Sequence, residues 1–122
     1  MKVFISQKMH GLETKDIVIN RDKIISSFCY QLDIDPEEVE VVNPIKRDLP
    51  DDATRLDYLG EAIKDLAKAD TIIFSKDAAE ARGCLVEEQA VRLYRNEYKW
   101  TVWLQSYKGE FRRKKYCKVK DW

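Results

Sequence analysis

The feature that most constrains the fold is the alternation of short apolar runs with longer amphipathic segments. The apolar runs lie at residues 3–5, 39–42, 71–74 and 101–104, and apolar residues at helical spacing fill the stretches between them. Strands that alternate with helices are typical of a parallel sheet covered on both faces. We therefore expect a single α/β domain of three layers, with a central parallel sheet of about four or five strands in a flavodoxin-like or Rossmann-like arrangement, flanked by helices.

Three helices are expected between these strands. Thr14 is the expected N-cap of the first. Asp77–Glu80 has the form of a capping box at the start of the third. The residues that recur at helical spacing are Ile17, Arg21, Ile24, Ile25, Phe28 and Leu32 in the first helix, Leu56, Leu59, Ile63, Leu66 and Ala67 in the second, and Val86, Ala90, Leu93 and Tyr94 on one face of the third.

Composition narrows the class of protein. Apolar residues make up 44% and charged residues 36% of the 122 residues, which fits a globular domain with one core. No apolar run approaches the roughly 18 residues of a membrane helix, and the N-terminus lacks the apolar region of a signal peptide. We expect a cytoplasmic protein with reduced thiols at Cys29, Cys84 and Cys117. Their spacing predicts no metal site, and no cofactor is expected.

The C-terminal segment differs from the rest in charge. Residues 108–122 contain seven basic and two acidic residues, although the whole chain has a net charge of zero. We therefore divide the chain into a domain at 1–107 and a basic extension at 108–122, with a turn at Lys108-Gly109 and a short fifth strand at 115–120. An edge strand or an oligomer contact is favoured for the extension over nucleic-acid binding, although clustered cations with aromatic neighbours can serve the latter.

Ligands of parallel α/β sheets bind outside the carboxyl ends of the strands. The loops expected there are 6–13, 43–54 and 75–82. The first lacks the glycine pattern of a dinucleotide or phosphate-binding loop, and an ordinary polar loop with a turn at Gly11 is the alternative. The candidate ligand-binding residues of the first loop are Ser6, Gln7, Met9, His10 and Gly11.

Gly83 and Glu87 are the second group of candidates. A glycine inside a helix costs roughly 1 kcal/mol relative to alanine, so Gly83 suggests close approach of a ligand to the backbone. Glu87 lies four residues later on the same helix face, about 6 Å along the axis. Burial would raise its pKa, and Arg82 would favour its ionised form. The alternative is a surface acid stabilised by the helix dipole. Glu80 is expected to cap the helix, and Glu88 to face solvent.

These segments carry a resemblance to a known family. The chain resembles the small phage and bacterial branch of the nucleoside 2-deoxyribosyltransferase-like superfamily over about residues 1–104. The matching segments are Ile5-Ser6-Gln7-x-Met9-x-Gly11, Tyr58-Leu59-Gly60, Ala69-Asp70 before an apolar strand, and Glu80-Ala81-Arg82-Gly83-Cys84-x-Val86-Glu87.

The resemblance implies an activity on the N-glycosidic bond of a nucleoside or nucleotide, by deoxyribosyl transfer or hydrolysis. It implies Glu87 as the nucleophile, with the 6–11 loop, Asp77, Arg82 and Gly83 around the sugar or phosphate. It also implies a homo-oligomer. The family commonly places an aspartate where this chain has Ala62. A non-catalytic binder of a nucleotide or ADP-ribose-like ligand is therefore the alternative function.

Overall fold

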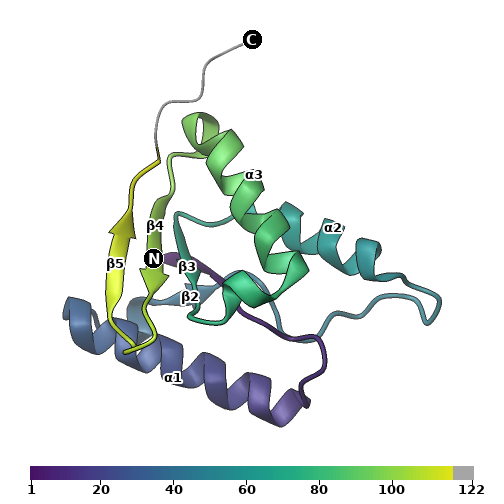
Figure 1. The fold of residues 1–122 in the computed structure, drawn as a ribbon, viewed down its shortest axis with the longest axis horizontal. Coiled ribbons are helices and arrows are strands. Elements are labelled where there is room, and N and C mark those ends of the chain that lie inside the picture. The colour runs from purple at the N-terminus through teal and green to yellow at the C-terminus, as the bar shows by residue number, and fades with distance from the viewer. Residues whose placement is uncertain (117–122) are drawn as a thin grey trace.

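The computed structural model of the chain describes residues 1–116 and contains one five-stranded sheet (Figure 1). The strands lie in the order β2-β1-β3-β4-β5. The first four are parallel, and β5 is antiparallel to β4. The strands are β1 (Lys2–Ser6), β2 (Glu40–Val41), β3 (Thr71–Phe74), β4 (Thr101–Gln105) and β5 (Phe111–Lys114).

Three α-helices cover the sheet. The helix α1 (Thr14–Leu32) lies on one face, and α2 (Arg55–Leu66) and α3 (Arg82–Tyr98) lie together on the other (Figure 1). Two short 3₁₀ turns, η1 (Pro36–Glu38) and η2 (Ala78–Glu80), complete the described elements. The expected three-layer α/β domain with a mostly parallel sheet is confirmed.

The core has two halves because successive side chains of a strand point to opposite faces of the sheet. In β1, Phe4 packs under α2 and α3, whereas Val3 and Ile5 pack under α1. Phe28 of α1 belongs to the half of the core under α1 and packs edge to face against Phe111 of β5, with ring centroids 5.2 Å apart. The largest fully buried side chains are Phe4, Phe28, Ile5, Ile72, Ile73, Val3, Val91 and Ser6.

The outer strand β2 is only two residues long, and a side chain continues its pairing. Ile5 donates its backbone N–H to Oδ1 of Asn43 at 2.9 Å, and Nδ2 of Asn43 donates to the Ile5 carbonyl at 2.7 Å. The amide of Asn43 thus forms both hydrogen bonds that a further strand residue would have made with β1.

Two of the expected helix starts are corrected. The N-cap of α1 is Glu13, and Thr14 is already inside the helix. The capping box at Asp77–Glu80 does not form, because these residues enter η2 and α3 begins only at Arg82, without a side-chain cap. A complete capping box occurs instead at α2, where Thr54 accepts from the backbone of Asp57 and the Asp57 side chain accepts from the backbone of Thr54.

The helix α3 presents a different face to the core from the one its apolar residues indicate. Its buried residues are Cys84, Glu87 and Val91. Val86 and Leu93 remain 45% and 47% exposed. Tyr94 is exposed as well, and Ala90 is half-buried. At about 100° per residue, Val86 and Leu93 lie roughly 100° or more around the helix from the buried row and point away from the sheet, whereas Ala90 packs at the edge of the core.

The fifth strand lies earlier than expected. Gly109, with φ of 84°, closes a turn by donating to the Ser106 carbonyl at 2.9 Å, which confirms the turn at 108–109. The chain then pairs at once with β4, since buried Phe111 stands opposite Gln105. The strand expected at 115–120 is therefore wrong at Lys115 and Tyr116, which follow β5, and its remaining part lies outside the described residues. The strand β5 forms one edge of the sheet.

None of the helices within residues 1–116 has the length and apolarity needed to cross a lipid bilayer.

Candidate functional site

The strand order places a topological switch point between β1 and β3. From these neighbouring strands the chain continues in opposite directions, to α1 on one face and to α3 on the other, so the loops at their carboxyl ends separate and leave room for a ligand. Ser6 ends β1 and pairs with Phe74 at the end of β3. Ser6 shares the α3 side of the sheet with Phe4, and Gln7 turns to the α1 side.

Glu87 is the buried carboxyl group at this point. The Ser6 hydroxyl donates to Oε1 of Glu87 at 2.8 Å, and only 8% of Glu87 is exposed. Burial raises the pKa of Glu87 to about 7, while the Ser6 hydrogen bond and the positive charges of Arg47 and Arg21 act in the opposite direction. Near neutral pH the group therefore divides between the acid and the carboxylate.

Arg21 supplies one of the two cations. It is 5% exposed, and its Nε donates to Oε1 of Gln7 at 2.7 Å while Nη1 donates to the Asn43 carbonyl at 2.5 Å. Burial lowers its pKa to about 10, which leaves it cationic at neutral pH. In the sequence, Arg21 belongs to the helical repeat of the first helix, and no function was predicted for it. A single charged residue among the apolar positions of that repeat is the feature that could have identified Arg21 as a site residue.

Arg47 supplies the other cation, from the 43–54 loop. Its Nη2 donates to Oδ2 of Asp65 at 2.5 Å, and Lys68 contacts Oδ1 of Asp65 at 3.2 Å. Asp65 is only 4% exposed. No sequence motif identifies Arg47, because its ion-pair partner lies in α2 and the carboxyl group whose pKa it lowers, Glu87, lies in α3.

Two of the predicted site residues are engaged by other parts of the protein. Gln7 is buried between Arg21 and the Ile17 carbonyl, to which it donates at 3.3 Å. Both hydrogen bonds of Gln7 thus connect the end of β1 to α1. Asp77, half-buried after β3, accepts from the Lys8 backbone at 3.3 Å and from the Ser75 hydroxyl. These contacts join the loop after β1 to the loop after β3.

The other residues of the first loop lie nearer to solvent. Met9 is half-buried, and His10 and Gly11 are exposed. Gly11 has φ of 81°, a conformation that side chains rarely adopt, so its role as a turn residue is sufficient to explain it. No described hydrogen bond joins these three residues to Glu87.

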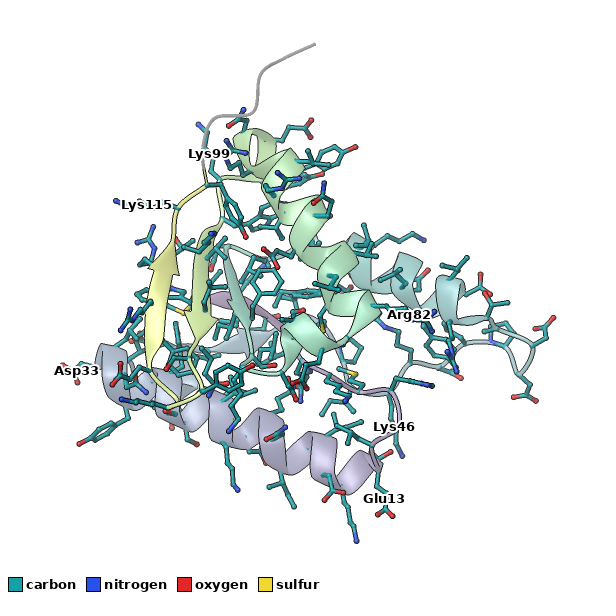
Figure 2. All side chains as sticks on the ribbon, viewed as in Figure 1. Glu13, Asp33, Lys46, Arg82, Lys99 and Lys115 are labelled. Carbon is teal, nitrogen blue, oxygen red and sulfur yellow. The ribbon has the colours of Figure 1, made fainter. Side chains whose placement is uncertain are left out.

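Arg82 does not act as expected. It is exposed at the first position of α3, at the end of that helix that lies beside α2 (Figure 2). The cations that lower the pKa of Glu87 are Arg47 and Arg21. Gly83 is half-buried, and a Cβ placed on it would meet only Cδ1 of Leu59, at 3.9 Å. Packing within the chain therefore does not require a glycine at this position.

Position 62 contains no acid and faces the core. Ala62 packs against the apolar cluster under α2 and α3. Asp65, one turn later, has both oxygens engaged by Arg47 and Lys68. Neither residue offers a proton to a departing group beside Glu87.

Two small hollows lie near these loops on the described surface. One, of about 260 Å³, is lined by Leu49, Pro50, Asp52, Ala53, Asp57 and Glu61. The other, of about 70 Å³, includes Asp77 together with Lys23 and Gln105. Glu87 lines neither of these two hollows.

The described thiols are buried and unpaired. Burial raises the pKa of Cys84 to about 11, against a hydrogen bond with Ser6, and also raises the pKa of Cys29. Neither is poised as a nucleophile. Within residues 1–116 no three His, Cys, Asp or Glu side chains are grouped so that they could hold a metal ion.

Comparison of the chain with protein-family models, with curated proteins and with solved structures gives no match. The chemistry of the site therefore rests on its own residues. A buried carboxyl group, a hydroxyl that orients it and two cations nearby form an arrangement that can attack or bind an electron-poor carbon or a polar ligand.

Proposed function

We propose that the protein acts on the N-glycosidic bond of a nucleoside or nucleotide, by deoxyribosyl transfer or by hydrolysis, with Glu87 as the nucleophile. The observation that supports this function is the hydrogen bond from Ser6 to the buried Glu87 at the carboxyl end of β1. It holds a carboxyl group at the place where ligands of parallel α/β sheets bind. The resemblance in spacing from Gly83 to Glu87 points to the same residue.

The chemistry would follow the two-step scheme of a retaining glycosidase. Ser6 holds Oε1 of Glu87, so Oε2 is the oxygen that bonds to the anomeric carbon as the bond to the base breaks. The bond electrons leave with the base, which takes a proton. Water or a second base then attacks the same carbon and gives up a proton to solvent, and the Glu87 carboxylate is released as its bond to that carbon breaks.

The two buried arginines would assist this reaction without touching the reacting atoms. Their charges favour the carboxylate form of Glu87 over the protonated form that burial favours. Since Ala62 and Asp65 supply no proton, the departing base would take its proton from solvent. Met9, His10, Gly11, Asp77 and Gly83 are the proposed ligand contacts.

The experiment is incubation with a panel of deoxynucleosides, ribonucleosides and their 5′-monophosphates, followed by chromatography of the free base. Release of base should fall at least about 100-fold in Glu87→Ala, because the covalent step is lost. The matched control is Glu88→Ala, one residue along α3, which should retain activity. Unchanged base release by the Glu87 variant would refute the proposal.

The alternative is a binder that leaves its nucleotide or ADP-ribose-like ligand intact. It is favoured by the apolar surroundings of Ala62, where the family resemblance would place an acid. Thermal-shift screening against these ligands separates the two functions. A binder should be stabilised by a ligand that is recovered uncleaved, and Glu87→Gln should keep the shift. Recovery of a cleaved ligand would favour the enzyme.

The proposal also covers the compartment, the assembly and the ligand class of the protein. Cytoplasm is the compartment that agrees with the free thiols of Cys29 and Cys84. A homo-oligomer is the assembly that the resemblance implies, and nucleic acid is not the proposed ligand.

A further inference from the structure

The outer side of α3 carries a stripe of five residues that we call the α3 stripe. Its spacings of four, four, three and four keep the five residues on one side of a helix. Val86 and Leu93 are 45% and 47% exposed, although both are large and apolar. The stripe consists of Arg82, Val86, Ala90, Leu93 and Glu97.

The α3 stripe is self-complementary when it is read in opposite directions. Its midpoint falls between positions 89 and 90. Val86 and Leu93 lie at equal distances from that midpoint, and so do Arg82 and Glu97. In two antiparallel copies, Val86 of each copy therefore stands opposite Leu93 of the other. At both ends a cation stands opposite an anion.

We propose that the α3 stripe is the interface of a homodimer, in which α3 packs antiparallel against α3 of a second copy about a two-fold axis near Ala90. A two-fold interface uses the same patch on both copies, which is what the symmetry of the stripe provides. Ala90, half-buried where the stripe borders the core, is the small residue that lets the two helices approach closely at the axis.

Charge supports a second copy as the occupant. Within residues 1–116, neither Arg82 nor Glu97 forms an ion pair, although five ion pairs occur among the described residues. Antiparallel packing gives each a partner of opposite sign. It also sets the positive N-terminal end of each α3 beside the negative C-terminal end of the other.

The helix α2 extends the apolar surface beside the stripe. Its Leu59 reaches within 3.9 Å of the place where a Cβ on Gly83 would stand, so the two helices meet there. Leu56, one turn earlier in α2, is 76% exposed, and Tyr58 is 43% exposed. A stable interface buries about 800 Å² on each partner, which is more than one helix stripe supplies. The exposed residues of α2 provide the additional area.

Sedimentation velocity over a range of concentrations tests the dimer. The unmodified protein should sediment as a dimer, and Leu93→Asp should raise its dissociation constant at least about 100-fold, because a charge would be buried without a partner. Leu93 is half-exposed in one chain, so circular dichroism should show an unchanged fold. The matched control is Tyr30→Asp on α1, where Tyr30 is 89% exposed, and it should remain dimeric. A monomer at all concentrations in the unmodified protein would overturn the proposal.

A charge swap tests the orientation of the two helices. Arg82→Glu alone and Glu97→Arg alone should each weaken the dimer about ten-fold, because each change sets like charges opposite one another twice in the symmetric interface. The double variant Arg82→Glu/Glu97→Arg should return to the original dissociation constant. Two single effects that simply add in the double variant would contradict the antiparallel pairing.

A cross-link tests the position of the axis. Ala90→Cys in a Cys117→Ser background places one thiol on each copy beside the two-fold axis, within reach of a disulfide. Mild oxidation should give a covalent dimer on a non-reducing gel. Tyr30→Cys in the same background should not. A dimer that forms in solution but gives no cross-link at position 90 would place the interface elsewhere and overturn the assignment to α3.

Discussion

Arg47 donates Nη2 to Oδ2 of Asp65 at 2.5 Å and so fastens the loop after β2 to α2. The side chains are 14% and 5% exposed, so the pair is largely withdrawn from water. Breaking a buried pair from one side leaves an uncompensated charge, whereas replacing both partners by apolar groups can be neutral. The pair is thus better suited to fixing the position of Arg47 than to adding net stability.

The first prediction follows from this asymmetry. Arg47→Met should lower the free energy of unfolding by about 2 kcal/mol, because Asp65 keeps only its contact with Lys68. Arg47→Met/Asp65→Leu should recover most of that loss. Urea denaturation at pH 7 measures both variants. A double variant less stable than the single one would show that the pair contributes net stability.

The second prediction concerns the pH dependence of stability. The pKa of Glu87 is about 7 in the folded chain, against an ordinary value of 4.5 for a glutamate side chain. Between these values the folded state holds the proton more tightly than the unfolded state, so the stability that Glu87 contributes falls as pH rises from about 4.5 to 7.

Glu87→Gln removes this titration. It should therefore stabilise the protein by about 3 kcal/mol at pH 8 and change little at pH 4. Denaturation at the two pH values measures the difference. The matched control for the substitution itself is Glu88→Gln, at the half-buried neighbouring position. Equal effects of Glu87→Gln at both pH values would contradict a raised pKa.

The third prediction uses the hydroxyl of Ser6. Its hydrogen bond lowers the pKa of Glu87, so its loss in Ser6→Ala should move that pKa above 7. If Glu87 attacks as a carboxylate, the acid limb of the rate profile should shift to higher pH in this variant, with loss of activity greatest below pH 7. Steady-state rates from pH 5 to 9 measure the shift. A uniform loss at all pH values would assign Ser6 a role in packing only.

The fourth prediction separates stability from function at Gly83. Gly83→Ala should stabilise the fold by about 0.5–1 kcal/mol, because the new methyl group meets only Leu59 at van der Waals distance. If a ligand approaches the helix backbone here, the same change should weaken ligand binding. Gly60→Ala in α2, where nothing lies within 4 Å, is the matched control and should stabilise without affecting binding. Equal binding by both variants would remove Gly83 from the site.

The fifth prediction tests the corrected helix starts. Thr54 caps α2 with its side chain, whereas Thr14 lies inside α1 and makes no cap. Thr54→Ala should cost about 1 kcal/mol of stability, and Thr14→Ala should cost little. Thermal unfolding of the two variants gives the comparison. A larger loss in the Thr14 variant would contradict the observed cap positions.

Much of the fold follows from the sequence because it depends on local patterns. The strand at 71–74 agrees with its apolar run in both bounds, and the fourth strand differs by one residue. The prediction of which face of α3 packs on the sheet was wrong for a physical reason. Val86 and Leu93 have the spacing of a core face, but the sheet is covered by Cys84, Glu87 and Val91. Apolar periodicity does not distinguish a face that packs on the sheet from one that remains exposed.

The site was predictable only in part. Glu87 followed from its spacing after Gly83, and its contact with Ser6 joins two of the predicted residues. The two cations were not predicted. Arg21 acts from α1 and Arg47 from a loop, and each reaches Glu87 only through the packing of elements far apart in sequence. No local pattern records such a relation.

The short strand β2 has a consequence for growth of the sheet. An exposed outer strand can template a further strand from another chain and so nucleate fibrils. Here β2 ends after two residues, and the Asn43 amide fills the next pairing position on β1. The opposite edge, β5, contains Arg112, Arg113 and Lys114. Repulsion between these charges and those of a second copy opposes edge-to-edge pairing of two β5 strands. Both edges of the sheet thereby oppose the addition of strand to strand between copies of this chain.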